Sequence, residues 1–327
     1  MSNAIRWGIL GTGRIARQFA EGLKVLPDAK LVAVGSRTAE PANVFEKLFG
    51  VPHPHASYEA LVNDPDVDVI YVATPHSCHM ENSLLALSAG KAVLCEKPFA
   101  INSREAEQVI AFARQKKLFL MEAMWTRCFP LMVKVRELLK SQAIGEVRML
   151  TADFGFRSEY HEEKRLFNPA FGGGALLDVG VYPVSLASMI FGTPTRITSL
   201  AHLGKTGVDE ESAIILAHAQ DQLAVLSAAV RTETPQEAII MGTQGRIRIH
   251  SEWWRPKTLT LSRNRGEPER MEFPITGNGY QFEASEVMNC LRSGKLECSV
   301  MPLDETLAIM KTLDTIRSQW GLKYPME

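Results

Sequence analysis

The stretch that decides the fold lies near the start of the chain and reads Ile5-Arg6-Trp7-Gly8-Ile9-Leu10-Gly11-Thr12-Gly13-Arg14-Ile15-Ala16. A short apolar strand runs directly into a G-x-G-x-x-A turn, and an amphipathic helix follows at Ile15–Val25. This is the context that a dinucleotide-binding fingerprint requires. Gly11 permits the tight turn, Gly13 leaves room for a pyrophosphate, and Ala16 lets helix and strand pack closely. The alternative is an ordinary strand–turn–helix with a glycine pair.

The residues that would bind the adenosine ribose follow the second predicted strand, Leu31–Val34. The chain there reads Gly35-Ser36-Arg37-Thr38 and has no acid until Glu40. An NAD enzyme places an acidic residue ~20 residues after the fingerprint, where it binds the ribose hydroxyls. Ser36 can instead donate a hydrogen bond to a 2′-phosphate, and Arg37 can pair with that phosphate or stack on adenine. The sequence therefore predicts NADP(H) as cofactor, unless Arg37 is merely a solvated loop cation.

The N-terminal part alternates short apolar runs with helix-period segments, which is typical of a parallel sheet wound with helices. We expect further strands at Val67–Ala73, Ala92–Cys95 and Leu118–Glu122. Helices are expected between the strands, at Pro41–Phe49, Glu81–Ala89 and Arg104–Lys116. His53-Pro54-His55 is expected to be a loop rather than a site. These elements predict an α/β Rossmann domain over residues 1–123.

After Glu122 the pattern changes. A helix is expected at Leu131–Lys140 and a strand at Val147–Phe156, and Gly172-Gly173-Gly174 opens a helix that runs to Ile190. Successive strands with short turns then continue to Phe273, which favours an antiparallel sheet. The helices Phe282–Leu291 and Leu303–Gln319 follow. Residues 124–327 are therefore predicted to form an α+β domain with a large, mostly antiparallel open sheet, for substrate binding and dimerisation.

Composition narrows the classes of partner. Lys and Arg total 36 and Asp and Glu 37 in 327 residues, so the net charge of −1 gives no electrostatic case for nucleic acid or an anionic membrane. No apolar run is expected to span a membrane, and the first residues lack a secretory signal. Five cysteines without metal or redox spacing suggest reduced thiols and a cytoplasmic location. No H-E-x-x-H or comparable cluster occurs, so no catalytic metal is expected.

Two further stretches carry a family resemblance. The first is Ala73-Thr74-Pro75-His76-Ser77-Cys78-His79, followed later by Glu96-Lys97-Pro98, and the second is Gly172–Tyr182. They resemble the signature region and the glycine-rich substrate helix of the glucose–fructose oxidoreductase and inositol dehydrogenase family, and the likeness covers nearly the whole chain. Within it, Glu122–Pro130 and Asp178–Tyr182 resemble the dihydrodiol dehydrogenase branch, NADP-dependent enzymes that also oxidise D-xylose.

The resemblance implies hydride transfer between a nicotinamide and a secondary alcohol or carbonyl of a sugar, cyclitol or trans-dihydrodiol. Such chemistry needs a group that moves a proton at the same oxygen. Many members have Asp-x-x-x-His in the glycine-rich helix, but this chain has Asp178 and Tyr182, so the tyrosine is the expected group. A free tyrosine has a pKa of about 10, and Lys97, just after a strand, is the ammonium expected to lower it. Asp178 could orient a substrate hydroxyl or hold Lys97.

The remaining roles also follow from the resemblance. Thr74, Pro75 and His79 would line the nicotinamide, and aromatic side chains would wall the substrate pocket. The predicted cofactor set is Gly11, Thr12, Gly13, Arg14, Ile15, Ser36, Arg37, Thr74, Pro75, His79, Glu96 and Lys97, and the predicted walls are Trp125, Phe154, Trp254 and, less securely matched, Tyr280. A small polyol or sugar as substrate and a homodimer through the C-terminal sheet are expected. The alternative function is a non-catalytic NADP(H)-binding regulator.

Overall fold

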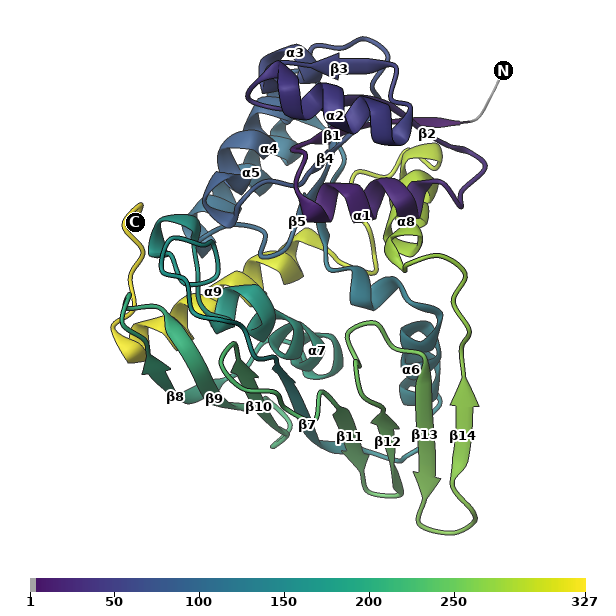
Figure 1. The fold of residues 1–327 in the computed structure, drawn as a ribbon. Helices are drawn as coiled ribbons and strands as arrows, with labels where there is room; N and C mark the ends of the chain where they lie inside the picture. Colours follow the sequence, from purple (N-terminus) through teal and green to yellow (C-terminus); the bar gives the residue numbers. More distant parts are fainter. Residues whose placement is uncertain (1–3) are drawn as a thin grey trace. The chain divides into compact units, whose positions relative to one another are not determined.

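A computed structural model describes residues 4–327 (Figure 1). By its internal contacts the chain divides into two units. The first comprises the residues up to Trp125 together with Ile275–Thr306, and the second comprises Thr126–Pro274 and Leu307–Glu327. The predicted domains, 1–123 and 124–327, differ from these units because helix α8 (Tyr280–Arg292) packs against helix α1 (Arg14–Leu23). A contact between segments so far apart in sequence leaves no local pattern.

The first unit is built on a six-stranded parallel sheet with the order β3-β2-β1-β4-β5-β6. Its strands are β1 (Ile5–Leu10), β2 (Ala29–Gly35), β3 (His53–His55), β4 (Val69–Val72), β5 (Ala92–Glu96) and β6 (Leu120–Ala123). The other helices are α2 (Ala39–Phe49), α3 (Tyr58–Val62), α4 (His79–Ser88) and α5 (Ser103–Lys116). The strand order reverses between β1 and β4, and ligands of open α/β sheets bind at such a switch point, beyond the carboxyl ends of the strands. The predicted Rossmann fold is confirmed.

Strand β3 corrects one prediction. The sequence analysis expected a loop at His53-Pro54-His55, but these residues pair in parallel with β2 through Ala33–His53 and Gly35–His55. Three residues are too few to show a strand pattern, and a proline argues against a strand in most settings. An edge strand tolerates proline, because its outer N–H groups have no ladder partner.

The second unit is built on an eight-stranded sheet with the order β14-β13-β12-β11-β7-β10-β9-β8. Within this sheet, among the strands that the structure describes, only β7 and β10 pair in parallel, so the predicted mostly antiparallel sheet is confirmed. The strands are β7 (Val147–Gly155), β8 (Arg196–Leu203), β9 (Asp209–Ala217), β10 (Leu223–Ala229), β11 (Ala238–Gly242), β12 (Gly245–Ile249), β13 (Thr258–Arg263) and β14 (Glu269–Glu272). Helices α6 (Pro130–Lys140), α7 (Val181–Phe191) and α9 (Leu303–Trp320) cover one face (Figure 1).

The segment Pro169–Phe191 corrects a second expectation. It is long and apolar enough to span a membrane, with a mean hydropathy of 1.6, although no such run was expected. In the fold, 78% of its most apolar window is buried, and α7 packs on β7 and β10. Small residues, Asp178 and Pro183 interrupt the larger apolar ones, so the segment is not one continuous apolar run. Burial against the sheet accounts for its composition.

Candidate active site

The glycine turn after β1 has the geometry that the fingerprint predicts. Gly11 has a φ of +110°, and a Cβ there would lie 2.8 Å from the carbonyl oxygen of Ala73, so only glycine fits. A Cβ on Gly13 would meet no atom within 4 Å, which leaves open space in front of the first turn of α1. That turn has no acidic side chain and no side-chain cap. Free N–H groups, positive helix dipole and open space together fit a pyrophosphate.

Ser36 and Arg37 follow the carboxyl end of β2. The backbone N–H of Ser36 donates to the carbonyl oxygen of His55 at 3.1 Å, and Ser36 is only 7% exposed. Arg37 is exposed, so its guanidinium can reach a ligand without moving a packed neighbour. Both residues therefore lie at the carboxyl end of the sheet, and their contact with the adenosine ribose stays a prediction.

The imidazole of His79 joins two loops at the carboxyl end of the same sheet. Its Nδ1 lies 2.7 Å from the carbonyl oxygen of Pro98, and its Nε2 lies 2.9 Å from that of Thr74. The Thr74 hydroxyl accepts a hydrogen bond from Asn82 at 3.0 Å. His79 is fully buried and positions these two loops, and its predicted place beside the nicotinamide stays a prediction.

Glu96, the last residue of β5, holds the backbone of Lys97. The Glu96 carboxylate accepts hydrogen bonds from the Tyr71 hydroxyl and, at 3.2 Å, from the backbone N–H of Lys97. Burial and then the negative charge of Glu96 raise the pKa of Glu283, on α8, well above its usual range. Sequence reasoning missed Tyr71 and Glu283, because only the packing of β4 and α8 brings them to Glu96.

Two predicted aromatic residues meet within the first unit. The rings of Trp125 and Tyr280 stack with centroids 4.4 Å apart and planes tilted by 21°. Tyr280 is the first residue of α8, and its ring also meets the edge of Phe19 on α1. The docking of α8 on α1 thus explains how a residue near position 280 comes to stand beside one near position 125.

In the second unit, Asp178 and Tyr182 share one helical turn. The helix opens with a π-helical segment, Leu176–Gly180, which continues into α7. Four residues span a little less than one turn of this wider helix, so both side chains project to nearly the same side. Single π-turns inside helices occur frequently at functional sites. The Asp178 carboxylate pairs with Arg165 at 2.9 Å, a partner that no pattern in the irregular segment before Asn168 revealed.

The glycines before this turn are required by packing. Gly174 has a φ of +110°, and a Cβ there would clash with the carboxylate of Asp209. That carboxylate is fully buried and accepts the backbone N–H of Leu176 at 2.6 Å, so it caps the π-turn. The hydroxyl of Tyr324 donates to the carbonyl oxygen of Gly173 at 2.6 Å and ties the C-terminal segment to the same motif. Asp209 is a positioning residue that sequence reasoning missed.

A wall of aromatic rings lies beside Tyr182. Phe154 and Trp254 stack with centroids 3.5 Å apart and planes 12° from parallel, and the Tyr182 ring lies 5.4 Å from that of Phe154. The Thr126 hydroxyl donates to the Trp254 backbone carbonyl at 2.6 Å and fixes the segment that carries it. The neighbouring Trp253 is instead a core residue, fully buried and bonded to β7. The stacked pair offers a flat apolar face next to a phenol hydroxyl.

The structure therefore gathers the predicted residues into two sets. The first unit carries the glycine turn, Ser36, Arg37 and Lys97, with Trp125 stacked on Tyr280. The second unit brings Asp178, Tyr182, Phe154 and Trp254 together. That Lys97 acts on Tyr182 stays a prediction.

Comparison with known proteins finds relatives of both the N-terminal and the C-terminal parts of the chain. Residues 5–124 match the model of an oxidoreductase family with an NAD-binding Rossmann fold, and residues 132–248 match a GFO/IDH/MocA C-terminal domain. A trans-1,2-dihydrobenzene-1,2-diol dehydrogenase from Xenopus tropicalis is 37% identical, with 98% of this chain and 100% of that protein covered. A D-xylose 1-dehydrogenase (NADP(+)) from Hypocrea jecorina is 35% identical, with 98% and 93% covered.

Two solved structures of oxidoreductases resemble this chain in fold. A 3-ketoreductase from Actinomadura kijaniata, crystallised with NADP and TDP-benzene, superposes with a TM-score of 0.86 at 27% identity, over 96% of this chain and 97% of that one. An aldose-aldose oxidoreductase from Caulobacter crescentus has the same fold, with a TM-score of 0.89 at 23% identity over 98% of each chain. The predicted family, oxidoreductase class and NADP(H) cofactor are confirmed. The chain belongs to the GFO/IDH/MocA family of oxidoreductases.

Proposed function

We propose that this protein is an NADP(H)-dependent dehydrogenase or reductase that acts on CH–OH groups of a sugar, a cyclitol or a trans-dihydrodiol. The observation that carries the proposal is the phenol of Tyr182 beside the stacked Phe154–Trp254 pair. A flat apolar wall suits the C–H face of a sugar and the ring of a dihydrodiol. The named relatives act on a dihydrobenzenediol and on D-xylose.

The residues of the first unit fit NADP(H). The open space at Gly13 and the acid-free first turn of α1 suit the pyrophosphate, and Ser36 with exposed Arg37 suits a 2′-phosphate. When bound, NADP⁺ accepts a hydride and NADPH donates one. The chain itself has to hold the substrate and to move a proton at the reacting oxygen.

We assign that proton to Tyr182. The tyrosine would take the hydroxyl proton during oxidation and return it during reduction, with Lys97 lowering its pKa. Asp178, held by Arg165, would orient a neighbouring substrate hydroxyl. Glu96 fixes the Lys97 backbone, and Tyr71 in turn fixes the Glu96 carboxylate. Neighbours thus hold Asp178, Glu96 and the backbone of Lys97 in place, which favours a fixed arrangement for catalysis.

A substrate panel tests the proposal. Reduction of NADP⁺ would be followed at 340 nm with D-xylose, D-glucose, inositols and trans-dihydrodiols, each beside a sample without protein. We expect turnover of at least one member that a Tyr182→Phe variant loses. Tight NADP(H) binding without turnover of any member, in either direction, would instead support the non-catalytic regulator.

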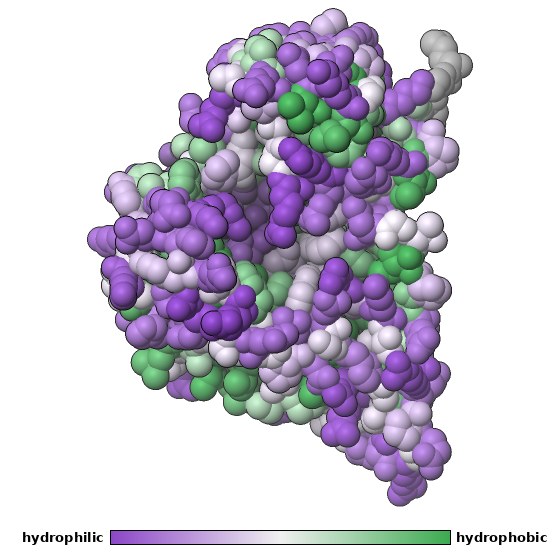
Figure 2. Space-filling model, in the orientation of Figure 1, coloured by the Kyte–Doolittle hydropathy of each residue, from purple (hydrophilic) through white to green (hydrophobic). Residues whose placement is uncertain are grey.

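We also propose that the protein is a cytoplasmic homodimer whose partner contact is the uncovered face of the eight-stranded sheet. Hydrophobic surface follows the rim over β8–β10 in Figure 2. Ile215 pairs with Val225 across β9 and β10, and both project outward, 47% and 38% exposed, while the neighbouring Ile214 and Leu226 are buried. Apolar faces of this kind are usually covered in an assembly. The five cysteines are free thiols, which fits a reducing compartment.

A further inference from the structure

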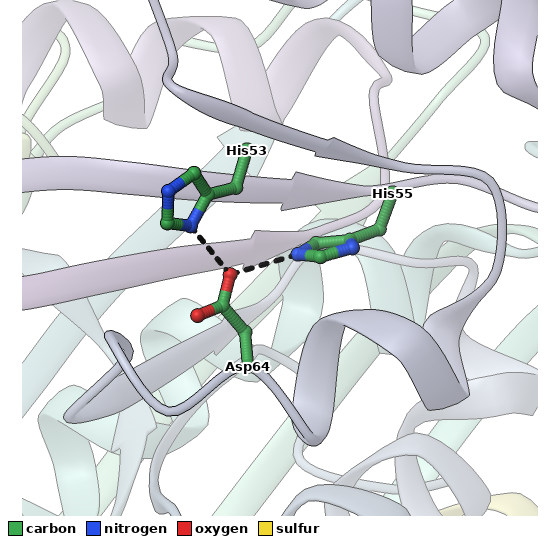
Figure 3. Close-up of side chains that lie close together, drawn as sticks. All are labelled: His53, His55 and Asp64. Atoms are coloured by element: carbon green, nitrogen blue, oxygen red, sulfur yellow. Dashed lines mark hydrogen bonds and ion pairs between the residues drawn. The ribbon is translucent and has the colours of Figure 1, made fainter.

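Two imidazoles and a carboxylate converge outside the region assigned to catalysis. His53 and His55 lie on β3, and Asp64 follows α3 (Figure 3). The Nδ1 of His53 and the Nε2 of His55 each lie 2.8 Å from the same oxygen, Oδ2 of Asp64. All three potential ligand atoms lie within 4.8 Å of one another.

The backbone sets up this convergence. Side chains two residues apart on a strand project from the same face, so the His-x-His spacing of β3 turns both rings toward α3. Pairing of β3 with β2 fixes the register of the two histidines. Pro54 between them restricts the backbone without removing a needed donor, because β3 is the edge strand.

The carboxylate is held more firmly than the rings. The Asp64 side chain is 3% exposed, and its Oδ1 accepts the backbone N–H of Asp66 at 2.8 Å. Lys91 binds the backbone carbonyl oxygens of Asp64 and Val67, at 2.6 and 2.8 Å, rather than the carboxylate. The Oδ2 atom therefore faces the two imidazoles. Their side chains are 38% and 23% exposed, so ions from solvent can reach the cluster.

We propose that His53, His55 and Asp64 form a binding site for a divalent transition metal of the Zn²⁺ class. Imidazole nitrogen and carboxylate oxygen are ligands that Zn²⁺ prefers, at about 2.0–2.2 Å, whereas Mg²⁺ and Ca²⁺ prefer oxygen alone. Ligand atoms around a tetrahedral ion at that distance lie roughly 3.3 Å apart. Each ring therefore has to withdraw from Oδ2 by about half an ångström, and the two imidazole nitrogens, which lie within 4.8 Å of each other, have to come to the same spacing.

The protons can be accommodated without a charged imidazole. A neutral histidine carries one N–H, and metal binding at one ring nitrogen leaves the proton on the other. His53 would bind through Nδ1 and His55 through Nε2, which are the atoms that already face Asp64. Three protein ligands leave a fourth position for water. The ion would cross-link the edge strand to the loop after α3 and so stabilise the first unit.

Calorimetric titration of the chelator-treated, full-length protein with Zn²⁺ tests the proposal. We expect one saturable site in the micromolar range or tighter, and a rise in melting temperature with Zn²⁺ that Mg²⁺ does not reproduce. His53→Gln, His55→Gln and Asp64→Asn should each weaken binding tenfold or more. His161→Gln is the matched control, because His161 also lies near two carboxylates, at 3.6 and 3.7 Å, but on an exposed segment.

The outcomes distinguish a specific Zn²⁺ site at His53, His55 and Asp64 from a general affinity of surface histidines for Zn²⁺. Unchanged Zn²⁺ binding in the His53→Gln and His55→Gln variants would overturn the proposal, as would the absence of saturable binding. Loss of binding only in His161→Gln would also overturn it and would place the ion elsewhere. Because Asp64 is buried, its substitution can disturb folding, so the Asp64→Asn result is used only if that variant still melts cooperatively. If it does not, the variants of the two half-exposed histidines decide the outcome.

Discussion

The guanidinium of Arg165 lies 2.9 Å from the carboxylate of Asp178, so the acid of the substrate helix is held from a segment without regular structure. The Asp178 side chain is 12% exposed and that of Arg165 41% exposed. The pair thus has one buried end and one open to solvent. This arrangement can fix the direction of the carboxylate while contributing little to the stability of the fold.

Replacement of Arg165 should therefore affect catalysis more than stability. Arg165→Gln should cost less than about 1 kcal/mol of unfolding free energy, because the arginine is half-exposed. We expect kcat/KM to fall roughly tenfold to a hundredfold, because a small displacement of an active-site group is costly. Arg148→Gln, which breaks a comparable exposed pair with Glu146 at 2.7 Å, is the control. Equal kcat/KM values for the two variants would mean that Asp178 needs no anchor.

Removal of the phenol hydroxyl tests the proton path. Tyr182→Phe should lower the single-turnover rate of hydride transfer about 10²–10⁴-fold and leave NADP(H) affinity nearly unchanged. Lys97→Met should be at least as damaging, because it removes a charge and a hydrogen-bond donor. Stopped-flow single-turnover measurement, beside a melting curve for each variant, checks both. A Tyr182→Phe variant that keeps most of its rate would leave Asp178 as the next candidate.

Cofactor preference should depend on Arg37. The wild-type protein should bind NADP(H) much more tightly than NAD(H), as measured by titration of protein fluorescence. Arg37→Ala should weaken NADP(H) binding roughly 10–100-fold, the range for a lost charge-assisted hydrogen bond, with little effect on NAD(H). Arg17→Ala, an exposed arginine on α1, is the control for a general change of charge. Tighter binding of NAD(H) by the wild type would refute the assignment of Ser36 and Arg37.

Stability should depend on pH through Asp209. Burial raises the pKa of Asp209 to about 7, although the hydrogen bond from Leu176 opposes the shift. Between pH ~4 and 7 the native state then keeps a proton that the unfolded chain has released, so the free energy of unfolding falls as pH rises through that window. The loss is at most about 4 kcal/mol. Urea unfolding would measure the free energy of unfolding at pH 5 and at pH 7.5. The decrease between these two pH values should be smaller for Asp209→Asn than for the wild type, and an identical decrease would contradict the role of Asp209.

The dimer proposal can be tested at the uncovered sheet face. Ile215→Glu places a charge beside exposed Val225 on this face and should shift the mass measured by light scattering from dimer to monomer. Leu48→Glu, at a 54% exposed position on α2, is the control and should leave the dimer intact. A monomeric wild type at micromolar concentration would exclude this interface.

The sequence alone determined the features that depend on residues close to one another along the chain. The glycine turn, the parallel sheet around it, the missing acid before Glu40 and the Asp178–Tyr182 spacing all follow from local sterics and periodicity, which act over a few residues. Only the tertiary structure decided the pairings of Arg165 with Asp178, Tyr71 with Glu96, Asp209 with Leu176, and His53 and His55 with Asp64. These contacts join segments whose separation is set by strand order and helix docking. No local sequence pattern predicts these contacts, because the burial and hydrogen bonding that stabilise them exist only after the chain has packed.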